Sequence, residues 1–132
     1  MKKATALLLV LAVASLALAA ACTTPPTRSA APVINVQDEI AATGAGLDDA
    51  LATYKAGDTV KAAQLAGDAY LDHFEFVEGR LGNVDLTFMQ GLEHLISTEL
   101  QNAMKDGKPV AEVEALVNKA KADLATAAAK LK

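Results

Sequence analysis

The sequence predicts an all-α protein, an up-down-up-down antiparallel four-helix bundle that follows a signal peptide and a Pro-rich tether. Residues 34–132 are rich in the strong helix formers Ala, Leu, Glu and Lys, and no stretch there alternates apolar and polar residues as a strand would. Turn residues divide this region into segments of similar length joined by short loops. Short connections make consecutive helices antiparallel neighbours, and this favours the bundle.

The first 21 residues resemble an export signal. Met1-Lys2-Lys3 is basic, and the following run from Ala4 to Ala21 consists of Ala, Leu, Val, Ser and Thr and ends in small residues. The run is long enough for a membrane span, but its small-residue end and the Pro-rich segment after it favour cleavage. We therefore predict a signal peptide over residues 1–21.

The residues before Cys22 resemble the lipobox of bacterial lipoproteins, in which the cysteine becomes the lipidated first residue of the mature protein. The four residues read Ala19-Ala20-Ala21-Cys22, with Ala19 at the position where Leu is usual. Cleavage at an Ala-x-Ala site without lipidation is the alternative. The only Cys of the chain has no partner for an internal disulfide, and this favours lipidation.

Residues 22–33 are predicted to form a flexible tether that starts at the lipidated Cys22. The segment is rich in Thr, Pro, Ser and Ala, and its prolines favour an extended form that would lift a domain off a membrane surface. A lipid on Cys22 would place the protein in the cell envelope outside the cytoplasm, with the domain in the periplasm or outside the cell.

Residues 34–132 are enough for one compact core and too few for two. The whole chain has a formal net charge of −4, and removal of Lys2 and Lys3 with the signal makes the remainder more acidic. Nucleic acid is not expected as a partner, because phosphate binding needs a basic face. An acidic surface is compatible with attraction of cations.

Breaks in the helical pattern predict helices at about 34–56, 58–81, 85–106 and 109–131. Gly57-Asp58 and Gly82-Asn83 followed by Asp85 are each expected to end one helix and cap the next, and Pro109 suits a first helical turn. The first helix is the least regular, because Gly44 and Gly46 disfavour it by about 1 kcal/mol each relative to Ala. We expect it to bend there or to start late.

Helical periodicity assigns one apolar stripe to each predicted helix, and these stripes are expected to form the core. The core positions are Ile40, Leu47, Leu51 and Tyr54; Ala63, Ala66, Gly67, Tyr70, Phe74, Val77 and Leu81; Met89, Leu92, Ile96, Leu100 and Ala103; and Val110, Val113, Leu116, Val117, Ala120, Leu124 and Leu131.

Acidic residues border these stripes on the second and third predicted helices. Glu78 and His73 lie at opposite edges of the second stripe, Glu75 lies beside Glu78, and Glu93 borders the third stripe. If the two helices are antiparallel, the carboxylates converge, and such oxygen-rich sites suit hard cations. The alternative is an ordinary solvated face, although no basic residue stands four positions after Asp72 or Glu75 to form helix salt bridges.

Several motifs of bundle enzymes and cofactor proteins are absent from the sequence. Neither His73 nor His94 has a Glu three residues before it, as a di-iron bundle requires. The first and fourth predicted helices contain no His or Met to ligate a haem, and there is no Cys-x-x-Cys-His motif. Nucleophile elbow, phosphate loop and zinc spacing are also missing. We therefore predict a non-enzyme without haem.

The segment from Ala69 to Leu81, followed by Asp85, by Gly91-Leu92-Glu93 and by Lys105-Asp106-Gly107, resembles a known domain. It is similar to the extracytoplasmic helical domain of bacterial members of the high-affinity iron permease family. The resemblance covers about forty residues in the second and third predicted helices. It implies iron handling outside the cytoplasm, with Glu75 and Glu78 as a Glu-x-x-Glu pair and Glu93 as the acid on the next helix.

Two functional hypotheses follow. The first is a lipoprotein that binds iron or another hard cation through Glu75, Glu78, Glu93, Asp72 and His73 and assists an iron permease or another envelope protein. The second is a structural or partner-binding envelope lipoprotein that binds no metal. It would dock through apolar residues expected to be exposed, namely Leu71, Phe76 and Leu95.

Overall fold

The structure is a computed structural model, and it describes residues 33–132. These residues belong to one compact unit that spans Pro32–Lys132. The described part is all-helical with four helices and no strands, which confirms the predicted fold class at this level. The predicted signal peptide, the lipidation of Cys22 and nearly all of the tether lie outside the described residues.

The first helix, α1 (Val36–Lys55), is a continuous α-helix. The side chain of Asn35 caps it by accepting a hydrogen bond from the Gln37 backbone N–H at 3.1 Å. The expectation that α1 starts late was wrong, because the helix runs from Val36 through both Gly44 and Gly46, and the alternative of a bend there stays a prediction. A Cβ on Gly46 would come within 2.7 Å of the Ala69 Cβ, so this glycine permits a close approach of two helices.

The second helix consists of α2 (Thr59–Ala69), a π-helical segment η1 (Tyr70–Phe74) and α3 (Glu75–Val84). Gly57, with φ of +95°, makes the turn before it, and the Asp58 side chain accepts from the Lys61 backbone N–H at 2.9 Å. The prediction that Gly82-Asn83 ends this helix was wrong. The helix continues to Val84, because Asp85 alone leaves the helical conformation and caps the next helix through the Phe88 N–H at 3.0 Å.

The third helix consists of α4 (Leu86–His94), a second π-helical segment η2 (Leu95–Leu100) and α5 (Gln101–Lys105). A turn at Gly107, with φ of +65°, leads to Pro109 and to the fourth helix, α6 (Val110–Lys130). The four helix ranges agree with the predicted ranges to within three residues.

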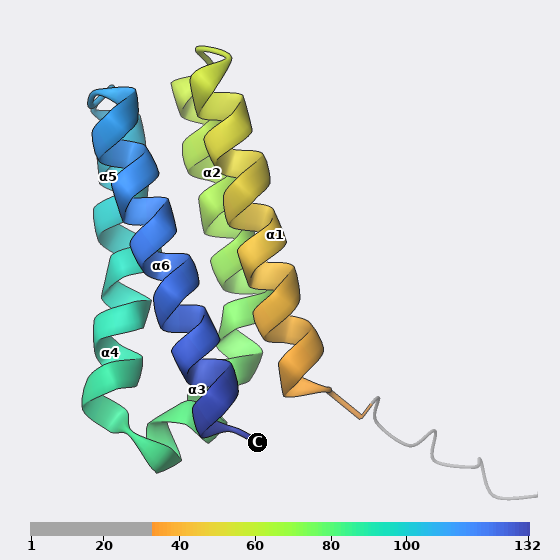
Figure 1. Ribbon diagram of the computed structural model, residues 1–132. Helices are drawn as coiled ribbons and strands as arrows, with labels where there is room; N and C mark the ends of the chain where they lie inside the picture. The colour runs from red at the N-terminus through yellow and green to blue at the C-terminus, as the bar shows by residue number, and fades with distance from the viewer. Residues whose placement is uncertain (1–32) are drawn as a thin grey trace, which may run out of the picture. The chain divides into compact units, whose positions relative to one another are not determined.

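The helices pack around one hydrophobic core. Helix α1 lies against α2 and α6, α2 lies against α5, and α3 lies against α4 (Figure 1). The predicted stripes supply most of the core, including the fully buried Leu47, Phe74 and Ile96. Two assignments were wrong: Val110 is exposed at the start of α6, and Leu95 is buried. Leu95 and Ile96 both face the core because η2 begins at Leu95 and changes the helical phase there.

Polar contacts fix the two ends of the domain. At the end where the described chain begins, which we call the proximal end, the Gln37 side chain donates to the Ala128 carbonyl at 3.1 Å. There Lys130 also pairs with Asp85 at 3.0 Å. At the distal end, the Tyr54 hydroxyl donates to the Lys108 carbonyl. The proximal end therefore combines the start of α1, the α3–α4 turn and the end of α6 (Figure 1).

Candidate functional site

Three carboxylates on α3 and α4 influence one another electrostatically near the contact of these two helices. Glu75 and Glu78 lie one turn apart on α3, and both Glu75 and Glu93 of α4 act electrostatically on Glu78. Val77 and Leu81 on either side of Glu78 are fully buried, so the stem of Glu78 is drawn partly into the helix contact. The charges of Glu75 and Glu93 therefore act on Glu78, but these side chains do not form a ligand group in the described residues.

Glu78 is the central member of this acidic cluster. Burial raises the pKa of the Glu78 carboxyl, the nearby Tyr70 hydroxyl lowers it, and the charges of Glu93 and Glu75 raise it further. The Oε1 atom of Glu78 is buried and has no partner with good hydrogen-bond geometry among residues 33–132, although the Tyr70 hydroxyl acts on the same carboxylate. The Tyr70 hydroxyl therefore compensates only part of the hydration that this carboxylate has lost.

Tyr70 provides the polar group on the inner side of the cluster. Burial, and then the hydrogen-bonding and charge of Glu78, raise the pKa of the Tyr70 hydroxyl well above its usual value. The phenol therefore stays protonated and is a hydrogen-bond donor near a group of acceptors. Its ring also contacts that of Phe74, with the ring centroids 6.1 Å apart, so the side chain is held from both sides.

A π-helical turn separates Tyr70 from Glu75. The Glu75 backbone N–H donates to the Tyr70 carbonyl five residues earlier, which is the hydrogen bond of a π-helix. The facing helix becomes π-helical at Leu95, two residues after Glu93. Such segments occur often at functional sites, since they reposition side chains at the expense of regular hydrogen bonding. Here one π-helical segment lies close in sequence to each half of the acidic cluster.

The other two predicted ligands lie elsewhere. The His73 Nδ1 atom is 2.8 Å from Oε2 of Glu39 in α1, so its imidazole is engaged by a different helix. Asp72 is exposed to solvent. Sequence reasoning missed both Tyr70 and Glu39 as polar partners. Tyr70 stands two helical turns before Glu78 and was assigned to the core, while the Glu39–His73 pair depends on how α1 packs and has no sequence signal.

Within residues 33–132, no group of three or more His, Cys, Asp or Glu side chains is arranged as a ready-made ligand set for a metal ion. This part of the chain also encloses no pocket. None of its helices is both long and apolar enough to cross a bilayer. The candidate site consists of partly buried oxygen atoms at the contact between α3 and α4.

Comparisons of the chain with known protein families, with curated proteins and with solved structures give no significant match.

Proposed function

We propose that this chain is an exported, lipid-anchored, non-enzymatic lipoprotein that binds iron or another hard cation and assists iron uptake. The carboxylates of Glu75, Glu78 and Glu93 would bind the cation. The observation that carries the proposal is the partly buried Glu78 carboxyl, whose Oε1 atom has no hydrogen-bond partner among residues 33–132 and whose pKa burial and the charges of Glu93 and Glu75 raise.

A bound cation would relieve both sources of the raised Glu78 pKa. It would neutralise the repulsion from Glu75 and Glu93, and it would replace the hydration that Oε1 lacks. Hard cations prefer such oxygen ligands. The site of this proposal forms only when the long Glu75 and Glu93 side chains rotate toward Glu78, because the described residues hold no preformed ligand set.

We propose an up-down-up-down antiparallel four-helix bundle as the scaffold of this site. Short turns at Gly57, Asp85 and Gly107 connect consecutive helices, and the contacts of α1 with α6 and of α3 with α4 support the arrangement. The lipid anchor would be on Cys22, and residues 22–33 would be the tether. This part of the proposal is supported by the sequence alone.

The test of cation binding is calorimetric titration of residues 33–132, which contain the whole described core. Ferrous iron is added without oxygen and ferric iron as a soluble chelate, each with calcium as competitor. The variant Glu75→Ala with Glu78→Ala should lose iron binding and keep its helical circular dichroism. The control, Asp49→Ala with Glu112→Ala, removes two exposed acidic residues outside the cluster and should bind normally. Equal iron binding by both variants, or full displacement by calcium, would overturn the proposal.

A second candidate function is partner binding without metal. The observation in its favour is that Leu71 and Phe76 remain 54% and 48% exposed on the same helix, although both are large and apolar. A photo-crosslinking residue at Phe76 should then trap one discrete envelope protein in living cells, with or without a chelator. The same residue at Val60, which is also exposed, is the matched control. Identical patterns at both positions would reject this function.

A further inference from the structure

The proximal end of the domain exposes large apolar side chains. Val84 and Leu86, on either side of the α3–α4 turn, are 57% and 55% exposed. Val33 and Ile34, where the described chain begins, are also exposed. Exposed apolar side chains that share one end of a domain indicate contact with something apolar.

Contacts among the helices fix the position of this end. Lys130 of α6 pairs with Asp85 between the two exposed residues, and its Nζ atom lies 5.4 Å from the centre of the Phe88 ring. Gln37 of α1 bonds to Ala128 of α6. The α3–α4 turn is therefore held to the helix that accompanies the start of α1, so Val84 and Leu86 stay at the end where the chain enters the domain.

The length of chain before the domain limits how far this end can move from the predicted anchor. Ten residues, 23–32, separate Cys22 from Val33. Fully extended, they reach about 33–36 Å, which is close to the length of about 30 Å that a 20-residue helix such as α1 spans. An anchor at Cys22 would therefore keep the start of the domain within this reach of the membrane.

In contrast to the expectation that the tether lifts the domain off the membrane, we propose that the proximal end contacts the surface of the membrane to which the chain is anchored, with Val84 and Leu86 entering the interfacial layer. The inference rests on the proposed membrane attachment through the N-terminal segment. Cation binding by the acidic cluster is independent of it.

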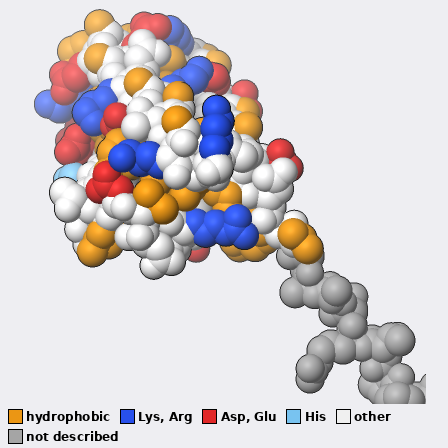
Figure 2. All heavy atoms as spheres, turned by 60° about the horizontal axis from the view of Figure 1, so that its bottom comes forward, with side chains coloured by type: hydrophobic (Ala, Val, Ile, Leu, Met, Phe, Trp, Pro, Cys, Tyr) orange, Lys and Arg blue, Asp and Glu red, His pale blue; other side chains and the backbone are white. Residues whose placement is uncertain are grey.

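The surrounding charges and the small size of the surface favour a membrane over a protein partner. Arg80 lies one turn before Val84 on α3, and Lys132 lies beyond the end of α6, whereas Lys130 is paired with Asp85 and two acidic residues lie in the first turn of α1. Figure 2, in which this end is turned forward, shows hydrophobic side chains next to those of Lys and Arg. Long basic side chains can keep their charges in the headgroup region while neighbouring apolar groups insert. A stable protein interface would need about 800 Å² from each partner, far more than two residues at a turn provide.

The chain contains no Trp, so a single introduced Trp reports on one position. We would reconstitute the full chain in phosphatidylcholine vesicles with or without bromine atoms on the acyl chains, which quench Trp on contact. The reporters are Leu86→Trp and Val84→Trp at the proximal end. Val60→Trp is the control, because Val60 is 75% exposed at the start of α2, at the distal end. Circular dichroism checks that each variant keeps its helical content.

We expect a blue-shifted emission and a clear loss of fluorescence in brominated vesicles for at least one proximal reporter, with no loss for Val60→Trp. Equal quenching at both ends, or quenching at neither, would overturn the inference, as would failure of the full chain to stay with the vesicles. The mass of Cys22 is measured on the same chain isolated from bacterial membranes. An unlipidated Cys22 together with proximal quenching would reject the proposed lipid and keep the membrane contact.

Discussion

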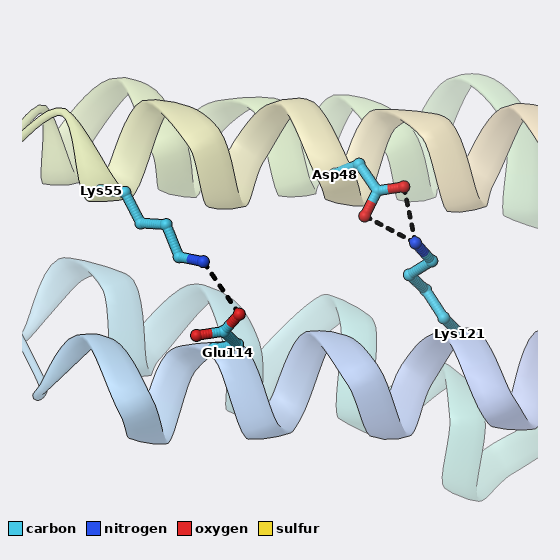
Figure 3. Close-up of polar contacts among 4 residues, drawn as sticks. All are labelled: Asp48, Lys55, Glu114 and Lys121. Carbon is cyan, nitrogen blue, oxygen red and sulfur yellow. Dashed lines mark hydrogen bonds and ion pairs between the residues drawn. The ribbon is translucent and has the colours of Figure 1, made fainter.

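The contact of α1 with α6 and the contact of α3 with α4 differ in the charges that they bring together. Asp48 and Lys55 of α1 pair with Lys121 and Glu114 of α6 at 2.6 and 2.8 Å (Figure 3). At the α3–α4 contact, the Glu78 carboxylate is instead influenced by the like charges of Glu93 and Glu75 and by the Tyr70 hydroxyl. One region therefore brings opposite charges together, whereas the other concentrates like charges around a partly buried group.

The difference indicates which of the two contacts is the better candidate for a function besides stability. Exposed ion pairs contribute little, but they remove repulsion and are compatible with tight packing such as that of Gly46 on Ala69. Like charges around a partly buried carboxylate destabilise the fold unless something binds them. Perturbed carboxylates of this kind are candidates for function, and the α3–α4 contact is therefore the better place for a binding site.

The largest effect is expected where α1 packs most closely. Gly46→Ala should destabilise the domain by about 1–3 kcal/mol, because the new Cβ would lie 2.7 Å from the Ala69 Cβ and the helices would have to separate. Gly44→Ala is the control. It has nothing within 4 Å and should stabilise α1 by up to about 1 kcal/mol. Urea unfolding measures both, and equal effects of the two variants would contradict the close packing.

Removing the central charge of the acidic cluster should instead stabilise the domain. Glu78→Gln keeps the shape of the side chain but removes a carboxylate that is partly buried and repelled by Glu75 and Glu93. We expect a gain of at most about 1 kcal/mol in the free energy of unfolding at neutral pH without cations, because solvent screens a carboxylate that is only partly buried. A loss of stability at neutral pH would show that the Glu78 charge is satisfied in the fold.

The pH dependence follows from the direction of the Glu78 shift. Its pKa is higher in the folded than in the unfolded state, so the folded protein binds the proton more tightly. The Glu78 contribution should therefore lower stability as pH rises from the ordinary carboxyl range through the raised pKa, and Glu78→Gln should remove this decline. The gain from Glu78→Gln should accordingly disappear in acid. A gain that is the same at all pH values would contradict this origin.

Asp85 shows that the same contact can hold a carboxylate favourably. The Phe88 backbone N–H and then Lys130 lower the pKa of Asp85, so its contribution to stability is present above the ordinary carboxyl pKa and is lost as pH falls through the lowered value. Asp85→Ala should destabilise α4 through the lost cap. Asp85→Asn should keep most of the cap, and thermal unfolding of the two variants separates capping from charge.

The smallest effect is expected for the ion pairs of α1 with α6. Reversing one charge by Lys121→Glu should reduce stability by less than about 1 kcal/mol, because both partners are largely exposed. Adding Asp48→Lys should restore the loss, and high salt should weaken both effects. A loss that salt leaves unchanged would mean that Lys121 acts through packing and not through its charge.

The sequence by itself determined the helical class, the four helices and most of the core. Helix formers, turn residues at Gly57 and Gly107, and apolar periodicity act locally, so they can be read without knowing the fold. The spacing of Glu75 and Glu78, with Glu93 on the next helix, also predicted that the charges of these three carboxylates influence one another, whereas a shared cation site stays a prediction.

Only the tertiary structure decided where the regular helical phase is broken and which residues pair across it. The π-helical segments begin at Tyr70 and at Leu95, and the second of them buries Leu95 beside Ile96. No local sequence pattern predicts these segments, because they depend on packing between helices. The Glu39–His73 pair and the approach of Gly46 to Ala69 likewise depend on how α1 packs against its neighbours. Local sequence fixes a helix and its faces, but contacts between residues distant in the chain depend on how the helices dock.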